Sequence, residues 1–160
     1  AARGAGEGVY LAINVAAMLV AFIAFVSMFN YFFGFFGTSM EAVLGVIFKP
    51  FAFLMGVPWE EAGQVGTLLG QKTVLNEFIA YDAMTKMNAD AATALSERST
   101  IIATYALCGF SNLGSIAILL GGIGTMAPSR RSDLASLGIK ALIAGTFACF
   151  ITANIAGLLI

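Results

Sequence analysis

The sequence contains no histidine, and its aspartate, glutamate, lysine and arginine residues together make up only 11% of the chain. The absence of histidine excludes histidine-based catalysis, zinc binding through histidine and a histidine pH switch. A soluble domain carries about 25% charged and about 45–50% apolar residues, whereas 59% of this chain is hydrophobic. Because the polar residues could not cover a water-facing surface, we exclude a soluble enzyme, a secreted disulfide domain and a disordered tail.

Basic residues and cysteines are also few. Eight lysines and arginines stand against nine aspartates and glutamates, which gives a net charge of -1 and no basic field for nucleic acid. The two cysteines, Cys108 and Cys149, lie in apolar stretches without metal-ligand spacing around them. We therefore expect no nucleic-acid partner, no protein-bound metal and no cofactor.

The chain instead has long runs without any charged residue, at residues 8–40, 99–129 and 141–160. A helix of about 20 apolar residues crosses a hydrocarbon core about 30 Å thick. The sequence therefore predicts an all-α polytopic membrane protein with about three transmembrane helices. We expect none of them to be a signal peptide, because the chain continues as a membrane protein after the first.

The middle of the chain, residues 40–87, has apolar runs that are too short to cross a membrane, because charge, proline or glycine interrupts them. The first runs favour an interfacial helix. Residues 59–74 and 76–87 favour a re-entrant hairpin of two half-helices. Backbone that is not helical persists at membrane depth only where it is buried in protein or lines a cavity, so the tip of this hairpin should face something polar.

The predicted hairpin tip carries ionisable side chains. Asn76 suits the N-cap of the second half-helix, and Glu77 falls in its first turn, where the helix dipole favours an anion. Lys72 either pairs with Glu77 to hold the tip together or takes part in function, since ionisable residues inside membranes are functional by default. Tyr81 lies one turn after Glu77 and either orients its carboxylate or anchors the helix at an interface.

The uncharged segment 99–129 is too long for a simple crossing. On a continuous helix Asn112 and Ser115 share a face, while Phe110 points nearly opposite Asn112. Unwinding within residues 109–114 would let all three approach one cavity, as in the broken helices of transporters. The alternative is a continuous helix whose glycines and serines pack against neighbouring helices. We expect the break.

The last predicted helix follows Arg130 and Arg131, which favour a cytoplasmic loop and hence an outward-facing C-terminus. Its small residues at four-residue spacing permit close packing against other helices. Hydroxyl-rich ligands suit the carboxylate, amide and hydroxyl groups of the hairpin tip and the broken helix, and the Phe110 ring can contact a planar base. The residues alone therefore predict one half of a solute transporter.

Two motifs in the sequence resemble those of one family. Residues 70–81 read Gly-Gln-Lys-Thr-Val-Leu-Asn-Glu-Phe-Ile-Ala-Tyr and resemble the Gly-x-Lys-x-x-x-Asn-Glu-Phe-x-Ala-Tyr signature of concentrative nucleoside transporters. Residues 105–115 resemble the second signature of this family, with Ser111 where alanine is common, and residues 50–59 and 127–131 also fit. The resemblance covers essentially the whole chain and matches only the C-terminal part of the family.

The resemblance implies a homotrimer that imports nucleosides across the plasma (inner) membrane, driven by Na⁺ or H⁺. It implies an inverted-repeat fold whose N-terminal half, absent from this chain, reads the base edge and builds the Na⁺ site. In this family pattern Glu77, Asn112 and Ser115 bind the ribose hydroxyls and Phe110 packs on the base. Three further residues of the motifs have supporting positions: Asn76, Lys72 and Tyr81.

These arguments divide the chain into five segments: a scaffold transmembrane helix at 1–40, an interfacial helix at 41–57, a re-entrant hairpin at 58–88, a discontinuous transmembrane helix at 97–128 and a C-terminal transmembrane helix at 129–160. We expect the first helix to stay at a trimer interface while residues 59–126 shift together in an elevator mechanism. The alternatives are a structural or oligomerisation module of the membrane and a transporter of another hydroxylated solute. An intramembrane enzyme is not expected, because no nucleophile–base pair is present.

Overall fold

The structure is a computed structural model that describes residues 2–160, with side chains from residue 4 onward. Every element in this part of the chain is helical, so the predicted all-α class is confirmed. The elements are α1 (Ala2–Gly34), α2 (Met40–Leu54), α3 (Trp59–Val74), α4 (Glu77–Ala89), α5 (Glu97–Leu107), α6 (Leu113–Met126), the short 3-10 helix η1 (Pro128–Arg130) and α7 (Arg131–Leu159).

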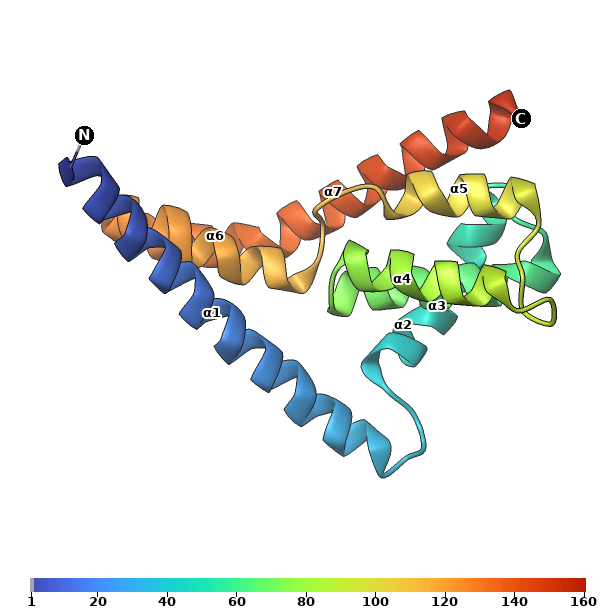
Figure 1. The fold of residues 1–160 in the computed structure, drawn as a ribbon, viewed down its shortest axis with the longest axis horizontal. Helices are drawn as coiled ribbons and strands as arrows, with labels where there is room; N and C mark the ends of the chain where they lie inside the picture. The colour runs from blue at the N-terminus through green and yellow to red at the C-terminus, as the bar shows by residue number, and fades with distance from the viewer. Residues whose placement is uncertain (1) are drawn as a thin grey trace.

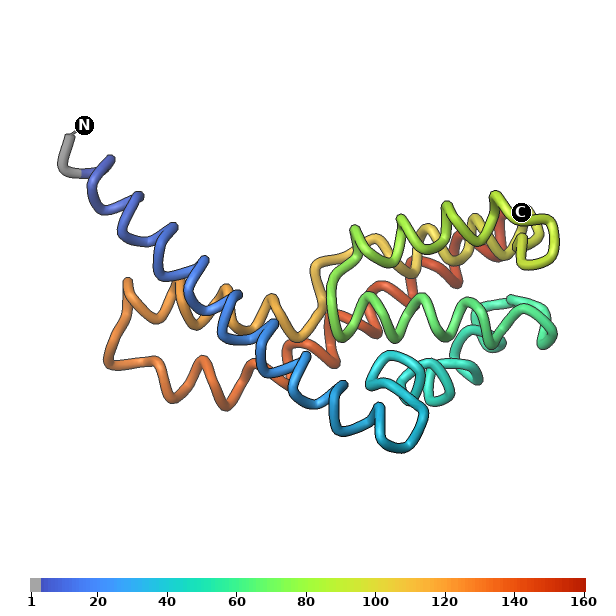
Figure 2. The backbone as a smooth tube through the Cα atoms, turned by 60° about the horizontal axis from the view of Figure 1, so that its bottom comes forward, coloured from blue at the N-terminus to red at the C-terminus, as the bar shows by residue number. Residues whose placement is uncertain are grey.

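The helices form an elongated, branched arrangement. Figure 1 shows α6 lying between α1 and the first part of α7, while α2, α3, α4 and α5 are grouped around the second part of α7. In Figure 2, α3 and α4 run side by side in opposite directions and are joined at one end by a tight turn. This α3–α4 hairpin and the α5–α6 pair meet near the middle of the molecule.

Among the described residues, two helices are long and apolar enough to cross a membrane. They are Gly4–Gly34, with mean hydropathy 2.5, and Pro128–Leu159, with mean hydropathy 1.9. The third expected span is divided between α5 and α6, because residues 108–112 are not helical. α6 is apolar but shorter than a spanning helix, so the predicted interruption of this segment is present.

The α2 and α3 helices are in direct backbone contact. A side-chain carbon at Gly66 would lie 2.5 Å from the carbonyl oxygen of Gly45, and one at Gly70 would overlap the carbonyl oxygen of Glu41. Glycines at these positions therefore let the two backbones approach, as in the small-residue contacts of membrane helices. The buried core forms around this contact and extends through α5 to the second part of α7.

Arg98, at the start of α5, binds backbone carbonyls from two distant parts of the chain. Its guanidinium donates to the carbonyl oxygens of Gly157 at 2.8 Å and Ile160 at 2.7 Å, and to that of Gly56 at 3.2 Å. Gly56 has a φ of +96° in the turn before α3, a conformation that favours glycine. Arg98 thus fixes the end of α7 and the α2–α3 turn to the base of α5.

The turn between α1 and α2 is closed by Asn30. Its side-chain amide donates to both carboxylate oxygens of Glu41, at 2.8 and 3.0 Å, and its oxygen accepts the backbone N–H of Met40 at 2.8 Å. Asn30 therefore satisfies one of the unpaired N–H groups at the start of α2. In the sequence it is an isolated polar residue in an apolar run, so its partners depend on the tertiary fold.

Replacement of Gly70 by alanine should destabilise the protein, because the new carbon overlaps the backbone of α2. We expect Gly70→Ala to lower the free energy of unfolding by about 1–3 kcal/mol, the usual cost of overpacking. Gly63→Ala is the matched control in the same helix, since no atom lies within 4 Å of its new carbon and helix propensity improves by up to about 1 kcal/mol. Thermal unfolding in detergent of the full-length protein compares the two. Equal unfolding temperatures would contradict the backbone contact.

Candidate solute-binding site

The tip of the α3–α4 hairpin presents a carboxylate at a helix N-terminus. α3 ends at Val74, and the side chain of Asn76 accepts the backbone N–H of Ile79 at 3.0 Å, so it caps α4 as predicted. Glu77 is the first residue of α4 and is half-buried. The unpaired N–H groups and the dipole of α4 favour a negative charge at this place, so the fold stabilises the Glu77 carboxylate where the chain turns back.

The interruption between α5 and α6 also ends in a capped helix N-terminus. Asn112 is 2% exposed, and its side-chain oxygen accepts the backbone N–H of Ser115 at 2.7 Å. The Ser115 hydroxyl donates to the carbonyl oxygen of Asn112 at 2.6 Å and accepts the Asn112 backbone N–H at 3.4 Å. This reciprocal cap fixes the first turn of α6 and engages the Ser115 hydroxyl locally.

The two capped N-termini meet. The side-chain amide of Asn112 donates to a carboxylate oxygen of Glu77 at 3.2 Å. Residues 35 positions apart in the sequence are therefore brought together by the hairpin tip and the helix break. The contact forms one polar point made of a carboxylate and an amide.

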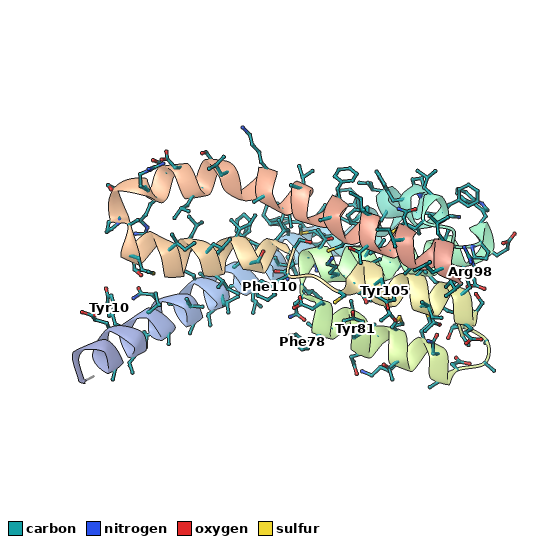
Figure 3. The ribbon with its side chains drawn as sticks, turned by 90° about the horizontal axis from the view of Figure 1, so that it is seen from above. Tyr10, Phe78, Tyr81, Arg98, Tyr105 and Phe110 are labelled. Carbon is teal, nitrogen blue, oxygen red and sulfur yellow. The ribbon has the colours of Figure 1, made fainter. Side chains whose placement is uncertain are left out.

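Two cavities adjoin the helix break beside this polar point, and Glu77 lines neither of them. One of about 320 Å³ is lined by Asn76, Asn112 and Phe110, together with apolar side chains of α1. The other, of about 290 Å³, lies between the break and α7 and is lined by Phe110 and Ser115. Phe110 is 58% exposed, and Figure 3 shows it near Phe78 at the middle of the molecule. Phe110 and Asn112 thus share a cavity, whereas Ser115 lines the second one instead of the predicted common cavity.

Lys72 and Tyr81 bind the end of α5 and do not bind Glu77. The Lys72 ammonium donates to the carbonyl oxygen of Ala106 at 3.1 Å, and the Tyr81 hydroxyl donates to that of Thr104 at 2.8 Å. Within residues 2–160 no salt bridge joins Lys72 to Glu77. The ion pair at the tip is therefore not formed, and Tyr81 holds the hairpin against α5 without a hydrogen bond to the carboxylate.

The helix break also packs against α7, a contact that sequence reasoning missed. The Cys149 thiol donates to the carbonyl oxygen of Cys108 at 3.7 Å and lies 3.8 Å from the Ser111 hydroxyl oxygen. A side-chain carbon at Gly109 would overlap the Cys149 sulfur. Every residue carries a backbone carbonyl, so the sequence does not identify Cys108 as an acceptor. Only the glycine at position 109 indicates that another part of the chain lies close to the break.

An apolar helical chain with a carboxylate at a hairpin tip, in contact with a broken helix, has the architecture of a membrane solute transporter. The family described as "Na+ dependent nucleoside transporter C-terminus" matches residues 1–157. The chain therefore belongs to the concentrative nucleoside transporter family, and it corresponds to the C-terminal part of that family.

Named relatives span bacteria and animals. The Bacillus subtilis (strain 168) protein "Uncharacterized transporter YutK" is 48% identical over 100% of this chain and 40% of its own length. The nucleoside permease NupC of Helicobacter pylori is 40% identical over 99% of this chain and 40% of its own length. Human solute carrier family 28 member 3 is 44% identical over 99% of this chain and 26% of its own length. The chain thus spans well under half the length of these relatives.

Solved structures of the transporter CNTnw have the same fold. A CNTnw variant in an outward-facing state gives a TM-score of 0.92 at 47% identity, covering 99% of this chain and 41% of that one. CNTnw in an inward-facing substrate-bound state gives a TM-score of 0.74 at 48% identity, covering 98% of this chain and 40% of that one. Three intermediate states give TM-scores of 0.82, 0.84 and 0.85.

Removal of the Tyr81 hydroxyl tests its role at the end of α5. We expect Tyr81→Phe to lower the free energy of unfolding by about 0.5–1.5 kcal/mol, the net value of one hydrogen bond, and to change solute affinity less than about twofold. Tyr105→Phe is the control, because the described residues provide no hydrogen-bond partner for the Tyr105 hydroxyl. Thermal unfolding and equilibrium binding of the full-length protein give both quantities. A large loss of affinity without a loss of stability would instead make Tyr81 part of the solute site.

Proposed function

We propose that this chain is the C-terminal part of a cation-coupled transporter that imports nucleosides, with the ribose held between the hairpin tip and the broken helix. The observation that carries the proposal is the Asn112–Glu77 hydrogen bond, which places a carboxylate and an amide at one point. The family match and the names of the relatives support nucleosides as the solute.

The chemistry of this point suits a sugar with neighbouring hydroxyls. An ionised carboxylate accepts hydrogen bonds only, whereas an amide both donates and accepts. Glu77 therefore accepts hydrogen bonds from the ribose hydroxyls, and Asn112, whose side-chain oxygen already caps Ser115, supplies an amide donor beside it. Ser115 acts mainly by fixing Asn112 at the start of α6. The exposed ring of Phe110 lines the same cavity as Asn112 and packs on the base.

The coupling ion in this proposal is Na⁺ or H⁺, and its site lies mainly in the N-terminal half that the chain does not contain. The family description names Na⁺ dependence, and a mouse relative is named sodium/nucleoside cotransporter 1. That half is the required partner in an inverted repeat. The protein is a multi-pass protein of the plasma (inner) membrane with its C-terminus outside, α2 lies along the membrane surface, and the α3–α4 hairpin is re-entrant.

The proposal includes a homotrimer and an elevator mechanism in which α1 is the fixed part. α1 leaves large apolar side chains uncovered along its length, including Val20 at 69% and Tyr31 at 70% exposure, which suits lipid and subunit contacts. The TM-score falls from 0.92 with the outward-facing state to 0.74 with the inward-facing state at nearly constant identity. This arrangement of the helices is therefore more similar to the outward-facing state than to the inward-facing one, and a change in helix arrangement between the two states is consistent with the proposed movement.

Replacement of Glu77 by glutamine tests the ribose site. The change keeps the shape of the side chain and removes charge-assisted hydrogen bonds, each of which contributes about 1.5–3 kcal/mol. We expect uptake of labelled uridine by the full-length protein to fall by more than about tenfold, while trimer assembly in detergent persists. Glu60→Gln, at the exposed start of α3, is the control. Near-normal uptake by Glu77→Gln would favour a structural module, and loss of uptake of a different hydroxylated solute would favour that solute.

Paired variants of Asn112 separate sugar binding from helix capping. Asn112→Ser retains a good N-cap for α6 but lacks the side-chain amide, whereas Asn112→Ala loses both. We expect both variants to weaken uridine binding more than binding of 2′-deoxyuridine or 3′-deoxyuridine, because the missing amide serves the ribose hydroxyls. Competition binding to the full-length protein measures these affinities. Equal losses for all three ligands, with recovery in Asn112→Ser, would assign Asn112 to the fold alone.

A further inference from the structure

Lys72 is a buried cation that the proposed ribose site does not use. Its side chain is 1% exposed and is among the largest fully buried side chains of the described residues. Within residues 2–160 no carboxylate lies within ion-pair distance of its ammonium group. A buried charge without compensation is strongly destabilising, so the surroundings of the ammonium must supply negative potential by other means.

The end of α5 supplies that potential. Ala106 lies in the last turn of α5, where the helix stops at Leu107 and carbonyl oxygens lose their N–H partners. These carbonyls carry the partial negative charge of the helix C-terminus, which a cation stabilises. The Lys72 ammonium donates to the Ala106 carbonyl at 3.1 Å, and a side-chain carbon on Gly109 would lie 3.8 Å from it. The ammonium therefore sits against the break itself.

The hairpin thus supplies opposite charges to the two sides of one interrupted helix. Lys72, near the end of α3, faces the C-terminal carbonyls of α5. Glu77, at the start of α4, contacts Asn112, the N-cap of α6. Each charge matches the sign that the adjacent helix end favours. The position of the break relative to the hairpin tip consequently depends on both charges, although only Glu77 lies at the proposed ribose site.

We propose that Lys72 is a positioning residue whose ammonium acts as a tethered cation in a cation-binding site at the α5 end of the break. Its ligands are the Ala106 carbonyl and the negative end of α5, and the site accepts a small alkylammonium ion when the lysine side chain is removed. By fixing the end of α5 against the hairpin, the ammonium keeps Asn112 within reach of Glu77. Only this last step rests on the proposed nucleoside function.

Three substitutions of Lys72 in the full-length protein test the proposal through stability and binding. Lys72→Met fills the same space without charge, Lys72→Arg retains a cation, and Lys72→Ala leaves room for an added ion. We expect Lys72→Met to lower uridine affinity by about tenfold or more and Lys72→Arg to recover most of it. Ethylammonium should raise the unfolding temperature of Lys72→Ala in a saturable manner, with no such effect on Lys72→Met or the unchanged protein.

The controls are Lys86→Ala and Lys86→Met, because Lys86 is an exposed lysine of α4 that pairs with Asp82. Ethylammonium should leave both unaffected. The proposal is overturned if Lys72→Arg behaves like Lys72→Met, or if ethylammonium stabilises no variant or all variants alike. If Lys72→Met and Lys72→Ala both fail to fold, a folded Lys72→Arg protein supports the need for a cation, and an unfolded Lys72→Arg protein overturns the proposal. The unfolding experiment with ethylammonium requires no nucleoside. It therefore tests the cation site even if the protein does not transport nucleosides.

Discussion

An interrupted helix inside an apolar protein has a backbone that must find hydrogen-bond partners, and this requirement organises the centre of the molecule. Where α5 stops, its last carbonyls lose their N–H partners, and where α6 starts, its first N–H groups lose their carbonyl partners. Inside a membrane protein, such groups need partners from the protein or from a water-filled cavity. The Lys72 ammonium and the Tyr81 hydroxyl bind the carbonyl end, while Asn112 and Ser115 cap the N–H end.

The same solution creates the candidate site. Because the hairpin must approach the break to satisfy the end of α5, its own tip lies beside the start of α6. Two helix N-termini then meet, and their combined positive potential favours the carboxylate of Glu77. The Asn112 amide completes the contact at 3.2 Å. The polar groups of the candidate site are therefore placed by the backbone requirements of the surrounding helices.

Local signals in the sequence predicted the cap at Asn76 and an interruption within residues 109–114, but not the cap formed by Asn112. Tertiary contacts determined the remainder. Asn76 and Asn112 cap the helices that follow them because each cap uses an N–H group only three residues away. In contrast, Lys72 binds a carbonyl 34 residues away and Tyr81 binds one 23 residues away. Every residue except proline carries the same backbone groups, so no pattern of side chains could identify these acceptors. The pairing of Asn30 with Glu41 was missed for the related reason that it requires the α1–α2 turn to be folded.

The position of α1 gives the proposed movement a physical basis. α1 contributes only apolar side chains to the cavity beside Asn112, among them Phe22 and Val26. Displacement of the hairpin and α6 along this surface would exchange one apolar contact for another and break no hydrogen bond there. The Asn30–Glu41 contact lies instead at the far end of α1, where the chain turns into α2. This cavity consequently has the polar side chain of Asn112 on one side and an apolar wall formed by α1 on the other.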